Sequence, residues 1–175
     1  MNVICNRDGY TGEEKAILIF GALLHDCGKP STTQYNDEGR IVSPGHDEEG
    51  IEIASAFMER IHAPKRFIQP VVDLVRYHMR HIHHVTPRTA RRFASRLGSI
   101  SKDDWLSIVE ADYSGRPPLP KGIPTAAQEL YDLIEVETQD NRVAQLVLGR
   151  HLVSRGYTPS KLFGIVLNEV YEIQL

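Results

Sequence analysis

The most constraining feature of the sequence is an apolar segment that ends abruptly on polar residues. Residues 16–24 read Ala-Ile-Leu-Ile-Phe-Gly-Ala-Leu-Leu, and His-Asp-Cys-Gly-Lys-Pro follows at 25–30. This pattern predicts a buried helix that ends at Asp26 and is stopped by Gly28. The alternative is an ordinary capped helix end, in which His25 offsets the helix dipole. A carboxylate is unfavourable at that end of a helix, so a bound cation explains Asp26 better.

Composition limits the classes of protein to which the chain can belong. Its 175 residues fit one domain with a sizeable core, and its apolar content of 41% is ordinary for a globular protein. A formal net charge of −3 gives no global attraction to nucleic acid or to an anionic membrane. The apolar segment is too short to cross a bilayer, so no membrane partner is expected. Two cysteines without metal-site spacing indicate no disulfide framework, and a cytoplasmic location is expected.

Periodicity and capping signals predict an all-α fold. The first helix is capped at Thr11, and residues 31–44 read as a loop with a short hairpin around 36–39. The third helix contains Pro70, which predicts a kink or a break. After the first helix, the expected helices span 46–61, 64–79, a basic segment from Pro87 through Arg96, 105–113, 126–139, and a short turn and last helix within 146–175.

Five residues of metal-ligand type fall at the predicted helix ends. They are His25, Asp26, His46, His78 and Asp112. Imidazole and carboxylate ligands together suit Mg, Mn, Fe, Co, Ni or Zn rather than Ca, and the sequence does not choose among these ions. A divalent ion of this kind lowers the pKa of bound water and holds a phosphoryl oxygen. Lys29 and Arg116 could supply positive charge to a phosphate, although Lys29 could equally be a surface lysine.

Two groups of basic residues leave alternatives open. His81, His83 and His84 lie close to His78, so that one of them could replace it at the site, or the three could form a solvated cluster. The arginines of the basic helix form either a solvated face or an RNA-binding surface; they are Arg88, Arg91, Arg92 and Arg96.

The order of these motifs resembles the HD superfamily of metal-dependent phosphohydrolases. Within it, the chain is similar to the HD domain that follows the polymerase head of bacterial CCA-adding tRNA nucleotidyltransferases. The matching segments are Leu-Leu-His-Asp-Cys-Gly-Lys-Pro at 23–30, Gly45-His46 with Gly50, Leu-Val-Arg-Tyr-His at 74–78, Ala-Asp-Tyr-Ser-Gly-Arg at 111–116, and the tail from Leu148 to Leu175.

The resemblance implies a helical bundle of the HD type and a role for each candidate. His25, Asp26 and Asp112 would be the central metal ligands, and His46 and His78 would bind a second ion or the substrate phosphate. Lys29 would contact phosphate and, with Asp26, take part in catalysis. The resemblance also implies an activity, because some relatives hydrolyse 2′,3′-cyclic nucleotides, 2′-nucleotides or phosphomonoesters with a transition metal or Mg.

The sequence departs from the family in two ways. No histidine precedes His25, where relatives usually carry a further ligand, and the nucleotidyltransferase head is absent. We expect residues 1–175 to be a single HD-type domain without an upstream helix or head, in which 125–175 is a helical C-terminal extension. Whether the chain is part of a longer protein, and its oligomeric state, stay open.

The predicted function is metal-dependent hydrolysis of nucleotide phosphate esters, of 2′,3′-cyclic phosphodiesterase or phosphatase type. The expected partner is a nucleotide or another phosphate ester, with tRNA as a further candidate. The alternative is a non-catalytic, tRNA-binding or scaffold portion of a tRNA nucleotidyltransferase-like protein. A third hypothesis is a sensor that binds a nucleotide without turnover.

Overall fold

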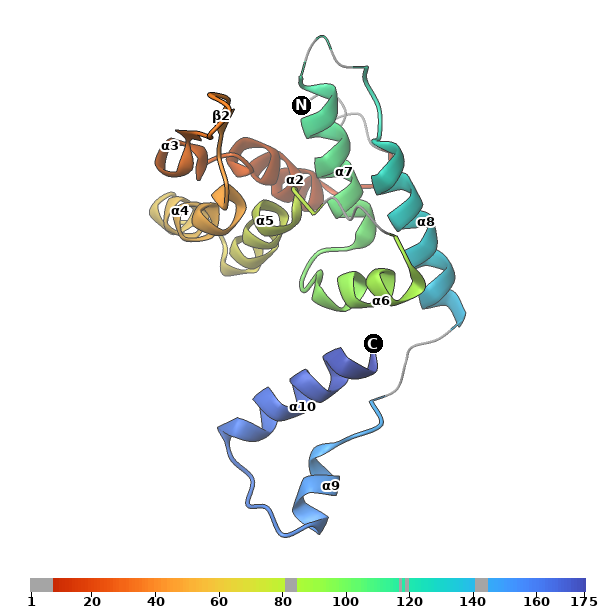
Figure 1. The fold of residues 1–175 in the computed structure, drawn as a ribbon. Coiled ribbons are helices and arrows are strands. Elements are labelled where there is room, and N and C mark those ends of the chain that lie inside the picture. Colours follow the sequence, from red (N-terminus) through yellow and green to blue (C-terminus); the bar gives the residue numbers. More distant parts are fainter. Residues whose placement is uncertain (1–7, 81–84, 117, 119, 141–144) are drawn as a thin grey trace.

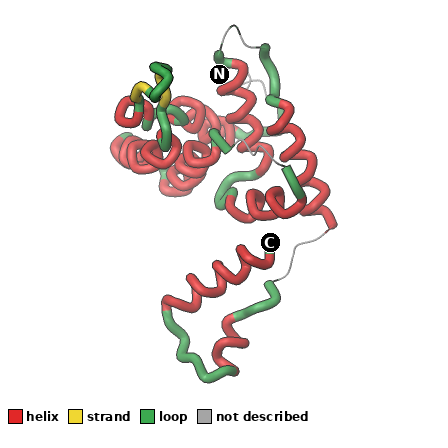
Figure 2. Tube along the Cα trace, in the orientation of Figure 1, coloured by secondary structure: helices red, strands yellow, loops and turns green. Residues whose placement is uncertain are grey.

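The fold is helical, as predicted, with a single small hairpin in the part that the structure describes. The computed structural model describes residues 8–80, 85–116, 118, 120–140 and 145–175. Figure 1 labels its elements, which are α2 (Gly12–Leu24), α3 (Lys29–Thr32), β1 (Gln34–Tyr35), β2 (Ile41–Val42), α4 (His46–Arg60), α5 (Lys65–Tyr77), α6 (Pro87–Arg96), α7 (Lys102–Ser114), α8 (Thr125–Asp140), α9 (Gly149–Ser154) and α10 (Lys161–Gln174). Figure 2 colours the antiparallel β1–β2 hairpin yellow among red helices, at the position where the sequence predicted it.

Local sequence determines both ends of α2. Thr11 and Glu14 form the expected capping box. The helix ends at Leu24, two residues earlier than predicted, and Cys27 N donates to the Leu24 carbonyl in the turn that follows. The prediction that Gly28 stops the helix is wrong, because its φ of −80° is one that any residue adopts. Gly28 is needed instead for a close approach to α4, described below.

Two apolar clusters meet at α2. The larger cluster lies between α2, α5, α6, α7 and α8 and includes Leu18 and Trp105. The smaller lies between α2, α4 and α5 and includes Leu24 and Met58. Ile17 packs against both clusters. Burying a side chain of this size contributes about 1.5–3 kcal/mol, so the end of α2 is held firmly where the two clusters join.

The helix α5 passes through the centre of the molecule and supplies residues to both clusters. It runs from Lys65 to Tyr77 without interruption, so the predicted break at Pro70 does not occur. A Cβ added at Gly21 would lie 2.6 Å from Leu74 Cδ1, so the absence of a side chain there lets α2 approach α5 closely.

A buried carboxylate ties α5 to the α6–α7 loop. Asp73 Oδ2 accepts hydrogen bonds from Ser99 N at 3.1 Å and from Ser99 Oγ at 2.7 Å. Its Oδ1 accepts from Gln69 Nε2 at 2.8 Å. These bonds compensate the buried charge and fix the loop before α7, the helix that carries Asp112.

The basic helix α6 uses three of its four arginines within the fold. Arg91 pairs with Glu137 of α8 at 2.6 Å, and Arg92 and Arg96 both pair with Glu172 of α10, at 3.4 and 2.6 Å. Figure 1 shows α9 and α10 extending away from the other helices. None of the helices within the described ranges is both long and apolar enough to cross a membrane.

Candidate metal centre

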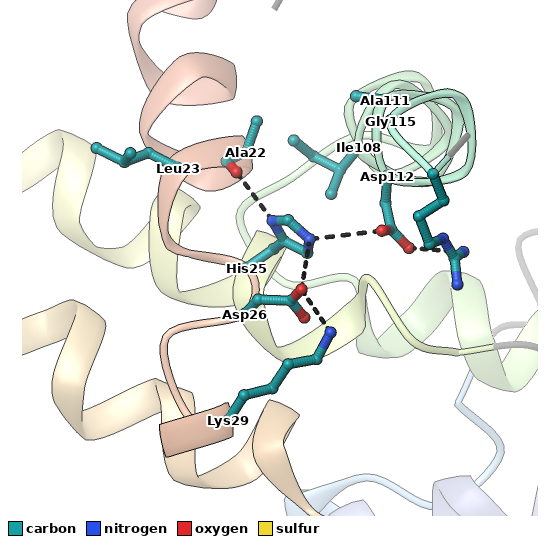
Figure 3. A pocket seen from close by; sticks show the side chains of 10 residues that line it. Ala22, Leu23, His25, Asp26, Lys29, Ile108, Ala111, Asp112 and Gly115 are labelled. Carbon is teal, nitrogen blue, oxygen red and sulfur yellow. Dashed lines mark hydrogen bonds and ion pairs between the residues drawn. The ribbon is translucent and has the colours of Figure 1, made fainter. Parts of the chain in front are cut away.

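Four helix ends bring the candidate ligands together. His25 and Asp26 follow α2, His46 is the first residue of α4, His78 follows α5, and Asp112 lies in the last turn of α7. Figure 3 shows His25, Asp26 and Asp112 pointing toward one another from α2 and α7. The resemblance implied that Asp112 joins His25 and Asp26, and the structure places Asp112 Oδ1 3.5 Å from His25 Nε2.

Two glycines allow α4 to approach the site closely. A Cβ at Gly28 would lie 2.1 Å from the His46 carbonyl oxygen and 2.8 Å from Gly50 N, which is too close for any side chain. A Cβ at Gly50 would lie 2.9 Å from Val75 Cγ1 of α5. Because the two atoms that this Cβ would meet are backbone atoms of α4, a side chain at residue 28 would have to move α4, and His46 with it.

The three site histidines are oriented in the same way. The Nδ1 atoms of His25, His46 and His78 lie 2.8, 2.7 and 2.6 Å from the carbonyl oxygens of Ala22, Ser43 and Val75, each three residues earlier. A carbonyl oxygen only accepts, so each Nδ1 carries the hydrogen. In the neutral form, each Nε2 therefore presents a lone pair to the centre, which is the usual arrangement of metal-binding histidines.

Asp26 divides its two oxygens between two sets of neighbours. Its Oδ1 lies 3.3 Å from His46 Nε2 and 3.7 Å from His78 Nε2. Its Oδ2 lies 3.3 Å from His25 Nε2 and 2.6 Å from Lys29 Nζ. On the second side, His25 Nε2 also lies 3.5 Å from Asp112 Oδ1. Asp26 is thus common to two groups of ligand atoms.

The electrostatics of the His25 side favour ionised partners. Burial opposes charge on His25, but the contact with Asp112 and the nearby Asp26 outweigh it and raise the pKa of His25 above its ordinary value. Burial also opposes charge on Asp26 and Asp112. Lys29 outweighs it for Asp26, and His25 with Arg116 outweighs it for Asp112, so the pKa of each carboxyl is lowered. Both carboxylates are therefore available as anionic ligands at neutral pH.

On the other side of Asp26, where Oδ1 lies, burial disfavours protonation of His78. His78 is fully buried, and burial is the main cause that lowers its pKa to about 4. The Nε2 atoms of His46 and His78 lie only 3.2 Å apart. When both rings are neutral, these two nitrogens face each other as lone pairs, and a cation that both can bind removes the repulsion.

The donor atoms have the spacing of metal ligands. Two ligands about 2.0–2.2 Å from one ion, at tetrahedral or octahedral angles, lie about 3.0–3.5 Å apart. The Asp26, His46 and His78 donors are 3.2–3.7 Å apart, and those of His25, Asp26 and Asp112 show contacts of 3.3 and 3.5 Å. Asp26, His46 and His78 form the compact group of three among the described residues. The residues present fit a divalent metal ion.

A pocket of about 400 Å³ opens on the His25 side of the centre. Lys29 and Arg116 line it, and Arg116 Nη2 lies 3.0 Å from Asp112 Oδ2. The rest of the wall includes apolar residues from α2 and α7, among them Ala22 and Ala111 (Figure 3). An anion with an attached organic group fits a pocket with this combination of cationic and apolar walls.

Comparison with known proteins now adds to this geometry. The family model described as HD domain matches residues 2–109, well over half of the chain. The chain belongs to the HD domain family. Asp112 lies just beyond the matched region, so its place in the site is supported by the structure rather than by the family match.

Two curated relatives of this HD domain are named tRNA nucleotidyltransferases, and a third is named a multifunctional CCA protein. The HD domain is 30% identical over 162 residues to an A-adding tRNA nucleotidyltransferase of Deinococcus radiodurans, covering 89% of this chain and 37% of the relative. It is 40% identical over 92 residues to a CC-adding tRNA nucleotidyltransferase of Thermus thermophilus, covering 52% and 21%. It is 28% identical over 158 residues to a multifunctional CCA protein of Hahella chejuensis, covering 85% and 34%. The chain thus spans little more than a third of these relatives at most. No solved structure matches it significantly.

The sequence-predicted ligand residues all reach this site of the HD domain. Asp26 forms the compact group with His46 and His78, and His25 Nε2 lies between Asp26 Oδ2 and Asp112 Oδ1 at 3.3 and 3.5 Å. The alternative ligands His81, His83 and His84 lie outside the described residues.

Sequence reasoning missed the backbone carbonyls that orient the histidines and the apolar wall of the pocket. The carbonyls belong to residues three positions before each histidine, and this constant spacing could have indicated them. No pattern marked Ile108, and Ala111 stood out only as the first residue of the matching segment 111–116. Both line the pocket because α7 packs beside α2.

Proposed function

We propose that this HD domain is a metal-dependent phosphohydrolase that acts on nucleotide phosphate esters, of 2′,3′-cyclic phosphodiesterase or phosphatase type. The observation that supports this most strongly is the convergence of His25, His46 and His78 on the two oxygens of Asp26, with Asp112 on the other side of His25 Nε2. Convergence from four helix ends, with every imidazole oriented by a carbonyl, is more than a capped helix end requires.

Each residue has a distinct part in the proposal. His25, Asp26 and Asp112 hold one divalent ion, and His46 and His78 with the other oxygen of Asp26 hold a second ion or face the phosphate. A bound ion supplies a water of lowered pKa and offsets charge on phosphorus. Lys29 and Arg116 bind the non-bridging phosphate oxygens, where negative charge accumulates during attack. The carbonyls of Ala22, Ser43 and Val75 keep the imidazole rings in place.

An activity panel tests this function. Purified protein is assayed on 2′,3′-cyclic nucleotides, 2′-nucleotides and a phosphomonoester with Mg²⁺, Mn²⁺, Co²⁺ or Ni²⁺, and Asp26→Ala serves as the inactive control. The imidazole-rich ligand set favours the transition metals over Mg²⁺. Turnover that depends on the metal and is lost in Asp26→Ala supports the proposal. Equal rates in both proteins would remove the catalytic role.

A second candidate function is tRNA binding without turnover. A pocket of about 250 Å³ between α5 and α6 is lined by Tyr77, Arg80, Thr89, Arg92, Phe93 and Arg96. Its arginines suit contacts with phosphate, whereas Tyr77 and Phe93 are buried in the larger apolar cluster. Glu172 pairs with Arg92 and Arg96, however, and reduces the positive charge available there. The names of two relatives, the A-adding and CC-adding tRNA nucleotidyltransferases, favour tRNA as the nucleic acid.

Salt dependence distinguishes this second candidate. Filter binding of tRNA at 50 and 200 mM salt measures how many phosphates the protein neutralises, because each contact releases counterions. Affinity that falls with salt and is weakened by Arg80→Ala, with no hydrolysis in the metal panel, would support a binding module. Arg40→Ala, in the exposed β1–β2 hairpin, is the matched control.

A further inference from the structure

We propose that Lys29 competes with the metal ion for Asp26 Oδ2. Once an ion binds that oxygen, the Lys29 side chain moves so that its ammonium group contacts the substrate phosphate instead. The inference rests on the proposed function, because it requires both an ion and a phosphate at this site. It adds an order of events: the ion displaces Lys29, and only then is the full charge of Lys29 available to substrate.

The competition follows from the atoms that share Asp26 Oδ2. Lys29 Nζ lies 2.6 Å from this oxygen, and His25 Nε2 lies 3.3 Å from the same oxygen. An ion held by His25 and Asp26 would sit within a few ångströms of the ammonium. Like charges at that separation repel strongly where water is partly excluded, so an ammonium at Oδ2 weakens ion binding. The side chain of Lys29 thus acts as a counter-cation supplied by the chain itself.

Arg116 has the opposite relationship to its carboxylate. Its Nη2 atom lies 3.0 Å from Asp112 Oδ2, whereas His25 Nε2 faces the other oxygen, Oδ1, at 3.5 Å. Arg116 therefore leaves the oxygen on the ligand side unobstructed, and it can keep its bond while Asp112 binds an ion through Oδ1. The two cations are close in exposure, at 46% for Lys29 and 49% for Arg116. They differ mainly in the oxygen that each one contacts: Lys29 contacts the Asp26 oxygen that faces His25, whereas Arg116 contacts the Asp112 oxygen that does not.

The pocket gives Lys29 a place to move to. Lys29 and the ligands His25, Asp26 and Asp112 all line the 400 Å³ pocket on the His25 side. The half-exposed lysine has a flexible four-carbon stem and three donors, so that the ammonium can leave Oδ2 and still reach an anion in the same pocket. A phosphate oxygen there replaces the carboxylate as its partner.

Metal affinity is the test, and it needs no turnover. Binding of Mn²⁺ alone is measured by electron paramagnetic resonance for the wild type, Lys29→Met, Lys29→Arg and Arg116→Met. Lys29→Met should bind Mn²⁺ about tenfold more tightly, corresponding to roughly 1.4 kcal/mol. Lys29→Arg should stay near the wild type, and Arg116→Met should show no comparable gain. With Mn²⁺ saturating, Lys29→Met should bind inorganic phosphate about tenfold more weakly by calorimetry.

The outcomes separate the inference from the function on which it rests. Unchanged or weaker Mn²⁺ binding in Lys29→Met overturns the competition, and so does an equal gain in Arg116→Met. Lys29→Gln repeats the test if the methionine variant does not fold. Asp26→Asn checks the site itself: if it binds Mn²⁺ as the wild type does, the proposed metal centre fails together with the inference. If Asp26→Asn loses binding while Lys29→Met shows no gain, only the inference fails.

Discussion

The Nε2 atoms of His46 and His78 face each other at 3.2 Å, although the two residues are separated by 32 positions in the chain. Their Nδ1 atoms are both committed to backbone carbonyls. Such a pair of imidazoles favours a shared cation over the empty arrangement, because the neutral rings direct lone pairs at each other. This relationship leads to the first prediction.

A divalent transition metal should stabilise the folded protein. At a free Mn²⁺ or Ni²⁺ concentration of 100 times the dissociation constant, the gain is about 2.7 kcal/mol, since the unfolded chain lacks the site. Thermal unfolding with and without metal measures it. Asp26→Asn should lose most of this gain, and Asp37→Asn in the exposed hairpin should keep it. A gain of the same size in both variants would show that the metal binds elsewhere.

The metal-free protein should lose stability as pH falls from about 6.5 to 4. The pKa of His78 is lowered by burial to about 4, so in this range the unfolded chain binds a proton that the folded chain does not. Stability therefore rises with pH between these limits, by up to about 3 kcal/mol. Urea unfolding in the presence of a chelator measures the slope.

His78→Gln should flatten this profile between pH 4 and 6.5. The raised pKa of His25 does not interfere, because a group of that kind contributes stability that is complete below 6.5 and is lost only as pH rises through its folded-state pKa. The lowered pKa values of Asp26 and Asp112 act at the acid end, below about 4. An unchanged slope in His78→Gln would assign the acid sensitivity to another group.

Gly28→Ala should damage both the fold and the site. Its Cβ would lie 2.1 Å from the His46 carbonyl oxygen, so α4 must shift, and overpacking of this kind typically costs about 1–3 kcal/mol or more. Metal affinity should fall as well, because His46 moves with the helix. Gly164→Ala in α10, where a Cβ meets nothing within 4 Å, should instead stabilise by about 0.5–1 kcal/mol. Unfolding in urea and Mn²⁺ titration compare the two.

Asp73→Ala should destabilise the fold without a direct effect on the metal ligands. It leaves Ser99 N, Ser99 Oγ and Gln69 Nε2 without their acceptor, at an expected cost of about 1–3 kcal/mol. Ser99→Ala removes one of these bonds and should cost less. Both variants should bind Mn²⁺ with near wild-type affinity while folded. A loss of affinity as large as that of Asp26→Asn would mean that the α6–α7 loop controls the position of Asp112.

Glu172→Gln should loosen the attachment of α10 to α6. Glu172 accepts from both Arg92 and Arg96, and these arginines lower its pKa. Exposed ion pairs contribute only about 0.2–1 kcal/mol each, so global stability should change little. Hydrogen exchange along 161–174 should nevertheless become faster. Glu169→Gln, on the same helix, is the control, and equal exchange in the two variants would count against an anchoring role.

Local sequence signals were enough to predict the main helices, most of their boundaries and the identity of the ligand-type residues. Capping boxes at Thr11, Thr86 and Ser101, and the apolar periodicity of α5, are local signals that do not depend on distant neighbours. His25 and Asp26 were visible because an apolar helix rarely ends on such a pair, and His46, His78 and Asp112 were visible because they fall at predicted helix ends.

The packing of the helices, by contrast, sets which of these ligand-type atoms lie within a few ångströms of one another and why residue 28 is a glycine. Local sequence signals do not specify the distance between His46 and His78, or between His25 and Asp112. These distances depend on how α4, α5 and α7 pack around α2. The same packing places a backbone carbonyl where a Cβ of residue 28 would be.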